Sequence, residues 1–573
     1  MIARAEHPRP DFRRKIWLNL NGEWDFKKEG ESEFRKIVVP YPPQSMLSKI
    51  NDTTQYSKVF YKREFKVPSS FKEGRIFLHF GAVDYFTEVW LNGVKLGSHT
   101  GGYDPFSFEV TKLIKFNDNN RLELKVIDEN KVGQAMGKQY ITSPPSGVRY
   151  ERVTGIWQTV WLELRGVSFL KGYRVYPKFS ERGVEIKVDV EGDDECSMEV
   201  EVWLFDEKIW DTSLHFQKSH TFEVRPKPFL PWSPEQPDLY TIIFRIVKEG
   251  EVIDEVEGYF GIRSVEAKNG LFKLNEQPIR LALVLDQGYY PDGLYTPPSD
   301  EVLRRDVEIV KELGFNGVRK HQIVAEPRYY YWCDRIGLLV FEEMPDWGLI
   351  LEEKYVRQFQ KEIRNVIERD FNHPSVIAWT PFNEKTEHYR DKLKQRLMDE
   401  TYELIKKIDP TRPVNINSGY VITKTDIVDI HEYGPTEKIR EMWIEKFSGE
   451  LPCSHNPVFA EGYRYNGQPI ILGEVGGRAS EDIKPIVDRP IFRHGGALKD
   501  IYHLLSYYRR LIEVIGSIYQ VTGFCYTQLY DVEGEVNGFL TYNREYKIDP
   551  ELIREINRKY LEKPSSSTID VLI

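Results

Sequence analysis

The feature that most constrains this sequence is a change in its hydrophobic periodicity near residue 265. Before that point apolar and polar side chains alternate with period two, the pattern of half-buried β-strands, and no amphipathic helix of useful length interrupts them. After it, short apolar runs alternate with helical patterns. The chain therefore divides into an all-β part and an α/β part.

The first 165 residues are predicted to form an antiparallel jelly-roll sandwich. Residues 75–80 and 122–127 alternate as strands do, and Asn92-Gly93 is a hairpin turn, because both residues tolerate positive φ. The number and spacing of such strands are typical of a jelly roll. We take 1–165 as the first domain.

Residues 166–264 continue the alternation without a helix. Clear strands lie at 183–190 and 198–204, and the proline-rich stretch 226–234 is a loop or a sheet edge, since proline cannot donate to a strand ladder. A region of about 100 residues made of short strands suits an immunoglobulin-like sandwich. We take 166–264 as the second domain.

Residues 265–573 are predicted to form a (β/α)8 barrel. Ser299 caps a helix that ends at Gly314, and further helices are expected over 327–336 and 354–371. The expected strands are 279–285, 317–321, 338–343, 376–380, 413–417, 427–431, 469–473 and 523–527. Strands that alternate with helices in this way favour a barrel. A doubly wound open sheet is the alternative, but it needs a glycine-rich phosphate turn after its first strand, which the sequence lacks.

Composition narrows the classes of function. The 573 residues include 79 basic and 89 acidic side chains, a net charge of −10, whereas duplex-binding proteins normally have a basic excess. The sequence has no uncharged apolar run of about 18 residues, so we expect no membrane span. The 4 cysteines are far apart and the amino terminus has no apolar signal segment, which predicts a cytoplasmic protein. A homo-oligomer is left open.

Two glutamates stand where barrel enzymes place their chemistry, at the carboxyl ends of buried strands. Glu384 follows the fourth expected strand and Glu474 the seventh. Two carboxylates across a barrel mouth can cleave a glycosidic bond, because one protonates the leaving oxygen and the other attacks or activates water. The alternative is an internal ion pair with Arg319 or Lys320. Other polar residues at strand ends are Asp286, His321, Glu342, Glu343, His431, Tyr433, Tyr526 and Gln528.

Longer motifs around both glutamates resemble glycoside hydrolase family 2. Residues 372–384, Asn-His-Pro-Ser-Val-Ile-Ala-Trp-Thr-Pro-Phe-Asn-Glu, are similar to the acid/base signature of that family, and residues 469–477, Pro-Ile-Ile-Leu-Gly-Glu-Val-Gly-Gly, to its nucleophile strand. Similarity to its jelly-roll domain and barrel entry lies at 20–26, 89–93, 101–106, 155–162 and 260–263. The family contains β-galactosidases, β-glucuronidases and β-mannosidases, and its domain order is the one derived above.

The resemblance implies a retaining, double-displacement mechanism. Glu474 would attack the anomeric carbon and form a glycosyl-enzyme. Glu384 would protonate the leaving oxygen and later deprotonate the incoming water, with the two carboxylates about 5–5.5 Å apart. Asn383 matches the family residue that binds the sugar 2-hydroxyl, and Arg319 matches the arginine that keeps the nucleophile ionised.

Strand-end residues complete the predicted substrate site. The run His431-Glu-Tyr433 resembles a strand end of related barrels, with Tyr433 a partner of Glu474. Asp286 stands where many members have Asn-x-His-Glu, and Tyr526 where many have a tryptophan platform. The predicted substrate-binding residues are Asn383, Asp286, Arg319, His321, Glu343, Trp379, His431, Tyr433, Tyr526 and Gln528.

Two further expectations concern the chemistry of these residues. Glu342 and Glu343 are neighbours on a strand and cannot both face the site. We expect no metal and no cofactor, because no His/Asp/Glu cluster has the sequence spacing of a metal site.

The substrate is predicted from the loop after the eighth strand. Family β-glucuronidases carry an Asn-x-Lys pair there, whose lysine reads the substrate carboxylate as a point charge. This sequence has Glu535 and Asn537 instead, and a glutamate facing a uronate would repel it, although Arg319 or Lys320 could supply a cation.

We therefore expect an exo-acting enzyme on a short carbohydrate that ends in a neutral sugar. A β-D-galactoside is the first choice and an α-L-arabinoside the second, with β-glucuronides and β-mannosides as further alternatives. A non-catalytic carbohydrate-binding protein is the alternative from another class.

Overall fold

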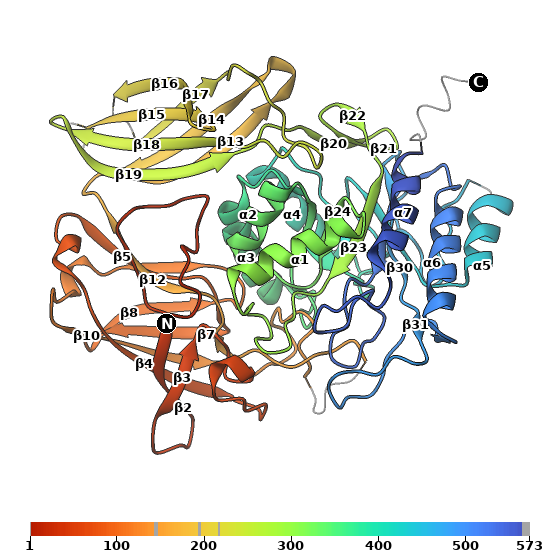
Figure 1. Ribbon diagram of the computed structural model, residues 1–573, viewed down its shortest axis with the longest axis horizontal. Coiled ribbons are helices and arrows are strands. Elements are labelled where there is room, and N and C mark those ends of the chain that lie inside the picture. Colours follow the sequence, from red (N-terminus) through yellow and green to blue (C-terminus); the bar gives the residue numbers. More distant parts are fainter. Residues whose placement is uncertain (1, 142–146, 193–195, 216–217, 448, 564–573) are drawn as a thin grey trace.

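The computed structural model describes residues 2–141, 147–192, 196–215, 218–447 and 449–563, which form two β-sandwiches and a barrel (Figure 1). The red-to-orange N-terminal sandwich and the yellow second sandwich both adjoin the barrel, coloured green to blue. The predicted fold class, a jelly roll, an immunoglobulin-like sandwich and a (β/α)8 barrel, is confirmed. The domain boundaries 1–165, 166–264 and 265–573 stay a prediction.

The N-terminal sandwich pairs a six-stranded sheet with a four-stranded one. The larger sheet has the order β3-β2-β4-β10-β7-β8, with bounds Arg35–Val39, Gly22–Lys28, Lys58–Lys66, Asn119–Ile127, Phe86–Leu91 and Val94–Thr100. The smaller has the order β1-β12-β5-β9, with bounds Trp17–Asn19, Val160–Arg165, Arg75–Phe80 and Phe106–Glu109. Alternate residues of both sheets, such as Leu78 and Leu124, form one buried core. The short strands β6 (Val83–Asp84) and β11 (Gly155–Ile156) pair beside it.

The second sandwich is also antiparallel. One sheet has the order β13-β14-β17, with bounds Phe169–Lys178, Gly183–Glu191 and Ser219–Val224. The other has the order β16-β15-β18-β19, with bounds Glu207–His215, Ser197–Leu204, Tyr240–Lys248 and Glu251–Phe260. The buried side chains of Ile186, Val200 and Phe244 belong to the core that the two sheets share.

Seven parallel strands form the barrel wall in the order β26-β25-β24-β23-β33-β30-β29. Their bounds are Val376–Thr380, Leu339–Glu343, Gly317–Lys320, Leu281–Asp286, Val521–Thr527, Ile470–Gly476 and Val428–Glu432. The expected strand 413–417 takes the place after β26: Val414 bridges Trp379, and β28 (Asn417–Ser418) pairs with β27 (Phe382–Asn383). The fifth strand is thus present only as isolated pairings.

Helices surround this wall. Their bounds are α1 Asp300–Glu312, α2 Pro327–Ile336, α3 Glu353–Asp370, α4 Lys392–Ile408, α5 Thr436–Arg440, α6 Ile501–Ile515 and α7 Pro550–Leu561. The predicted cap is found, since the Ser299 side chain accepts a hydrogen bond from the backbone N–H of Val302. Among the described residues, no helix combines the length and the apolar character needed to cross a membrane.

Side chains on the wall alternate between the barrel interior and the helices. On β23, Leu281, Leu283 and Leu285 belong to the interior core, whereas Ala282 and Val284 belong to the core under the helices. Phe272 joins the interior core from the hairpin β20–β22 (Val265–Lys268, Leu271–Leu274 and Gln277–Pro278), together with Trp232 of the second sandwich. These apolar side chains fill the barrel interior below the carboxyl ends of the strands, and those ends are left for a site.

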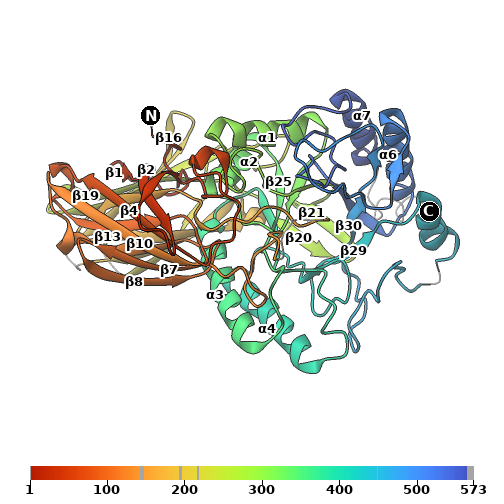
Figure 2. The same cartoon turned by 90° about the horizontal axis from the view of Figure 1, so that it is seen from below.

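A loop of the N-terminal sandwich docks on the barrel near those carboxyl ends. In Figure 2 orange segments leave the sandwich and cross to the barrel. The backbone N–H groups of Gly133, Met136 and Gly137 donate to the carbonyls of Gly348, Trp347 and Pro345, at 2.7, 3.1 and 3.1 Å. We call residues 133–140 the docking loop.

Gly137 allows the docking loop to approach the barrel so closely. Its φ is +58°, and a Cβ placed on it would lie 2.3 Å from the backbone carbonyl oxygen of Gln322. Only glycine satisfies both conditions without strain or displacement.

We predict that Gly137→Ala displaces the docking loop. The left-handed backbone alone costs about 1–2 kcal/mol for alanine, and the clash with a main-chain oxygen adds to it. Thermal unfolding and limited proteolysis of residues 130–150 would measure the effect. Gly93→Ala is the matched control, because Gly93 has φ +83° with no atom within 4 Å. Equal destabilisation by the two substitutions would contradict the predicted clash.

Candidate active site

Strand alternation brings one set of polar side chains into the barrel. Glu343 shares its parity with the interior residues Leu339 and Phe341 of β25, and His431 with Ile427 just before β29. Arg319 has the opposite parity to Val318 of β24, which belongs to the core under the helices. Their neighbours Lys320 and Glu342 point towards the helices. The structure therefore answers which glutamate of the pair faces the site: Glu343 does.

Arg319 lies at the centre of this set, with no exposed surface. Its Nε donates to Glu343 Oε2 at 2.7 Å, its Nη2 donates to Asn383 Oδ1 at 2.7 Å, and its Nη1 donates to the carbonyl of Gly473 at 2.8 Å. Nη2 also lies 3.0 Å from Glu474 Oε1. The guanidinium therefore fixes groups from three other strand ends in one geometry.

Glu474 is held at one oxygen and open at the other. Tyr433 donates to Oε2 at 2.6 Å, and the ring of His431 places Nδ1 3.4 Å from the same oxygen. Oε1 has the charge of Arg319 beside it but accepts no hydrogen bond within the described chain. The carboxylate thus keeps one oxygen with lone pairs available.

Glu384 faces the same space from β27 and the turn after it. His431 Nδ1 lies 2.9 Å from Glu384 Oε1, and the Tyr420 hydroxyl donates to that oxygen at 2.7 Å. The residue has φ +56°, and its backbone N–H donates to the carbonyl of Ser418 at 2.8 Å. About a quarter of its side chain is exposed, at 26% against 7% for Glu474, so Glu384 lies closer to solvent.

The electrostatics of the site favour ionised carboxylates around a charged imidazole. Burial alone would raise the pKa of Glu474, but His431 and Arg319 outweigh it and hold that pKa at about 2. Burial also opposes ionisation of Glu384, and the hydrogen bond and charge of His431 bring its pKa to about 2. The pKa of His431 is correspondingly raised by Glu474 and Glu384 against the effect of burial.

Eight predicted site residues meet here, and four lie elsewhere. The residues brought together are Glu384, Glu474, Asn383, Arg319, His321, Glu343, His431 and Tyr433. Asp286 has both oxygens engaged, by Lys320, Tyr329, Tyr530 and the N–H of Gly288, on the helix side of the wall.

The other three also point away from the glutamates or are fully engaged. Trp379 donates to Asp409 Oδ2 at 2.8 Å, towards the end of α4. Tyr526 stacks on Phe539 with ring centres 4.4 Å apart and is fully buried, so it is no sugar platform. Gln528 is also buried, accepting from Gln287 and donating to Asn537.

Sequence reasoning missed residues on the fifth strand position. Tyr420 bonds Glu384, and Ser418 lies 2.9 Å from His431 Nε2 while donating to Asp429 Oδ2 at 2.6 Å. The signal was present, because Asn417-Ser418-Gly419-Tyr420 directly follows an expected strand. These residues are polar and follow a strand, so the rule that barrel sites lie at the carboxyl ends of strands applies to them as well.

The glutamate pair and His431 also offer possible metal ligands, because one atom of each lies within 4.8 Å of the others. The Arg319 guanidinium 3.0 Å from Glu474 already supplies positive charge at that carboxylate, which disfavours a further cation. The expectation of a metal-free site stays a prediction.

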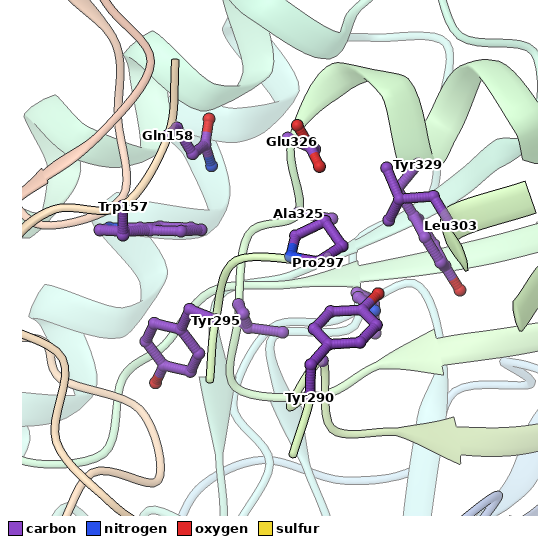
Figure 3. Close-up of a pocket in the computed structure, with 12 residues that line it drawn as sticks. Trp157, Gln158, Tyr290, Tyr295, Pro297, Leu303, Ala325, Glu326 and Tyr329 are labelled. Carbon is purple, nitrogen blue, oxygen red and sulfur yellow. The ribbon is translucent and has the colours of Figure 1, made fainter. Parts of the chain in front are cut away.

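A small cavity elsewhere is not the substrate site. It measures about 20 Å³ and is enclosed by the rings of Trp157, Tyr290, Tyr295 and Tyr329 where the N-terminal sandwich meets the barrel (Figure 3). A space of this size holds about one water molecule. Neither Glu384 nor Glu474 lines it.

We predict opposite stability effects for the two neighbouring glutamates. Burial opposes ionisation of Glu343, yet Arg319 and His321 lower its pKa to about 2. This pKa is below that of an unfolded glutamate, about 4.3, so the stabilisation is complete above that value and is lost as the pH falls towards 2. At pH 7, Glu343→Gln should destabilise the barrel by about 3–5 kcal/mol, because it removes one partner of a buried ion pair.

Glu342→Gln is the matched control. Burial and Asp370 raise the pKa of Glu342 well above its usual value, so this carboxyl is protonated in the folded protein and its contribution falls as the pH rises. The glutamine variant should match the wild type at about pH 4 and gain relative stability towards pH 7. Thermal melts of both variants across this range test the pair, and equal losses at pH 7 would contradict the assignment of Glu343 to the interior.

Comparisons with known protein families agree with this architecture. The model described as "Glycosyl hydrolases family 2, sugar binding domain" matches residues 17–170. "Glycosyl hydrolases family 2" matches 168–263, and "Glycosyl hydrolases family 2, TIM barrel domain" matches 297–480.

Individual relatives are more distant. The chain is 28% identical over 441 residues to a β-galactosidase of Thermoanaerobacter pseudethanolicus, which covers 73% of this chain and 57% of that protein. It is 25% identical over 515 residues to a protein of Formosa agariphila provisionally assigned as a β-glucuronidase, covering 81% and 60%. The chain thus spans less than two thirds of the length of these relatives.

A solved structure shares the whole fold. The β-D-glucuronidase of Dictyoglomus thermophilum superposes with a TM-score of 0.79 at 21% identity, over 98% of this chain and 99% of that one. At this identity the likeness concerns the fold alone. Because three family models follow one another from the first sandwich into the barrel, the chain belongs to glycoside hydrolase family 2.

Proposed function

We propose that this chain is a retaining glycoside hydrolase that removes a terminal sugar. The observation that carries the proposal is the separation of the two carboxylates: one oxygen of Glu384 lies within 4.8 Å of one oxygen of Glu474. Retaining enzymes hold the pair about 5–5.5 Å apart, whereas inverting enzymes need about 6.5–9.5 Å to admit a water molecule. The short separation supports direct attack by one carboxylate.

Glu474 is the proposed nucleophile. Its Oε2 is fixed by Tyr433, while Oε1 accepts no hydrogen bond among the described residues and has Arg319 3.0 Å away. The low pKa caused by His431 and Arg319 keeps the carboxylate ionised at neutral pH. Oε1 would therefore attack the anomeric carbon and form the glycosyl-enzyme.

Glu384 is the proposed acid and base, and His431 is its source of a proton. The Ser418 hydroxyl donates to Asp429, so its oxygen is free to accept from a protonated His431 Nε2 at 2.9 Å, and Arg319 Nη1 lies 3.3 Å from the same nitrogen. A second proton is shared in the hydrogen bond between His431 Nδ1 and Glu384 Oε1, which are 2.9 Å apart. In the free protein it resides on the imidazole, and we propose that it passes to Glu384 as the leaving oxygen departs.

Asn383 is the proposed contact for a sugar hydroxyl. Its Oδ1 accepts from Arg319 at 2.7 Å, which orients the amide. Its Nδ2 is buried and donates to no group in the described part of the chain. A buried donor without a partner is costly, so a substrate hydroxyl at this point would be bound favourably.

The structure leaves the identity of the terminal sugar more open than the sequence analysis did. The prediction of a neutral sugar, a β-D-galactoside first, depended on Glu535 facing the substrate. Glu535 has no exposed surface; Tyr150 donates to its Oε2, and Asn537 donates to Oε1 at 3.2 Å. Lys138 lies 3.9 Å from the same carboxylate. Repulsion of an acidic sugar by Glu535 therefore loses its structural basis, and both neutral and acidic sugars stay open.

We predict that alanine variants of the two glutamates respond differently to azide. Glu474→Ala and Glu384→Ala should each lower turnover by roughly 10³-fold or more while the protein stays folded, as followed by circular dichroism. Azide should restore activity to Glu474→Ala with an inverted glycosyl azide and to Glu384→Ala with a retained one. Product anomers are read by NMR, and exchanged outcomes would reverse the two roles.

A further inference from the structure

The docking loop carries a lysine to the barrel mouth. Lys138 follows Gly137, whose backbone touches Gln322 at the end of β24 and bonds Pro345 after β25. Its ammonium also lies 3.9 Å from Glu535, in the loop after β33. Lys138 therefore stands above the carboxyl ends of three barrel strands.

The side chain of Lys138 is largely buried, and its ammonium makes few polar contacts. Its side chain is 6% exposed, and Glu535 is its one ion-pair partner in the described chain. Nζ lies 5.4 Å from the ring centre of Trp347 and 5.5 Å from that of Tyr150, and within the described ranges it donates no hydrogen bond. An ammonium has three donors, and those of Lys138 have no hydrogen-bond acceptor in the described chain. Such a group is suited to an acceptor that arrives with a ligand.

Lys138 is connected to the reaction centre from two sides. Glu535 lies 3.5 Å from His494, and the His494 ring stacks on Tyr433 at 4.3 Å, the tyrosine that holds Glu474. On the other side, burial and the charge of Lys138 lower the pKa of His321, which lies 3.0 Å from Arg319. Contacts thus link the lysine to two residues that hold the nucleophile, Tyr433 on one side and Arg319 on the other.

A second cation lies beside it. The Arg149 guanidinium stands 4.5 Å from the Trp347 ring centre and donates to the carbonyls of Gly137 and Gln139, at 2.9 and 3.2 Å. No carboxylate lies within ion-pair distance of Arg149 among the described residues. Two cations therefore share the Trp347 ring, and Glu535 is the one carboxylate paired with either.

Three cations at the carboxyl ends of the barrel strands, Arg319, Lys320 and Lys385, are already engaged. Arg319 pairs with Glu343 and Glu474, and Lys320 with Asp286 at 2.8 Å. Lys385 donates to the carbonyl of Leu349 at 2.7 Å and lies 3.5 Å from Asp346. The sequence analysis considered Arg319 and Lys320 as cations for an acidic sugar. Both are paired with barrel carboxylates, so neither is available for this role.

We propose that Lys138, with Arg149 beside it, binds a carboxylate on the terminal sugar, so that the substrate is a uronic acid glycoside. The inference rests on the proposed glycosidase function and names its substrate class. An ammonium recognises a carboxylate as a point charge, and one in a buried setting discriminates strongly against a neutral hydroxymethyl group. The specificity residue would then come from the N-terminal sandwich and not from the barrel.

The test compares nitrophenyl β-glucuronide and β-galacturonide with β-glucoside and β-galactoside. We expect the wild type to have the higher kcat/KM on one of the uronides. Lys138→Met should lower kcat/KM on that uronide by roughly 100-fold while changing the value for the matching neutral sugar less than about threefold. Lys138→Arg keeps the charge and should retain the uronide preference, which guards against a methionine variant that fails to fold.

Lys131→Met is the matched control. Lys131 precedes the docking loop, has a 65% exposed side chain and should leave all four rates unchanged. A wild-type preference for a neutral sugar, or an equal loss on all substrates in folded Lys138→Met, would overturn the inference and leave the glycosidase proposal standing. Absence of hydrolysis of all four, together with absence of covalent labelling of Glu474 by 2-deoxy-2-fluoro glycosides of the same sugars, would overturn the proposed function itself.

Discussion

The burial of one guanidinium inside the barrel is the constraint on which the site depends. Arg319 has no exposed surface, and an unpaired charge there would be costly. The carboxylates of Glu343 and Glu474 and the amide oxygen of Asn383 satisfy it from three other strands. The ionised carboxylate proposed for the nucleophile, Glu474, also balances the buried charge of Arg319. The same ion pair therefore serves both the proposed reaction and the stability of the barrel.

Much of this arrangement follows from local sequence patterns. Periodicity and the strand-end rule predicted the barrel and the position of both glutamates at its mouth, and the family resemblance supplied their proposed roles. Strand parity would have gone further, since it separates Arg319 from Lys320 and Glu343 from Glu342. It also accounts for the helix-side position of Asp286, which shares its parity with Ala282 and Val284 on the same strand. Position at a strand end alone does not tell which face a side chain occupies.

Other contacts depend on parts of the chain that no local pattern connects. Tyr420 follows a strand position made of isolated pairings, so its approach to Glu384 depends on how the barrel closes. Glu535 was assigned to the correct loop, but its partner Tyr150 is 385 residues away in sequence. The docking loop has no repeating apolar pattern, so its sequence does not mark it as a segment that docks on the barrel. The surroundings predicted for Glu535 from its own loop therefore miss the contacts with Tyr150 and Lys138 from that other part of the chain.

The distribution of charge suggests how the domains divide their tasks. Three barrel cations near the mouth are matched by barrel carboxylates or carbonyls: Arg319 by Glu343 and Glu474, Lys320 by Asp286, and Lys385 by the carbonyl of Leu349. A segment docked onto the barrel can supply a further cation for the sugar, and the loop with Lys138 is such a segment. Under this division the barrel cleaves the bond and the sandwich sets the charge of the sugar that is accepted. Backbone hydrogen bonds hold the docking loop on the barrel, so its position does not depend on these contacts of its side chains.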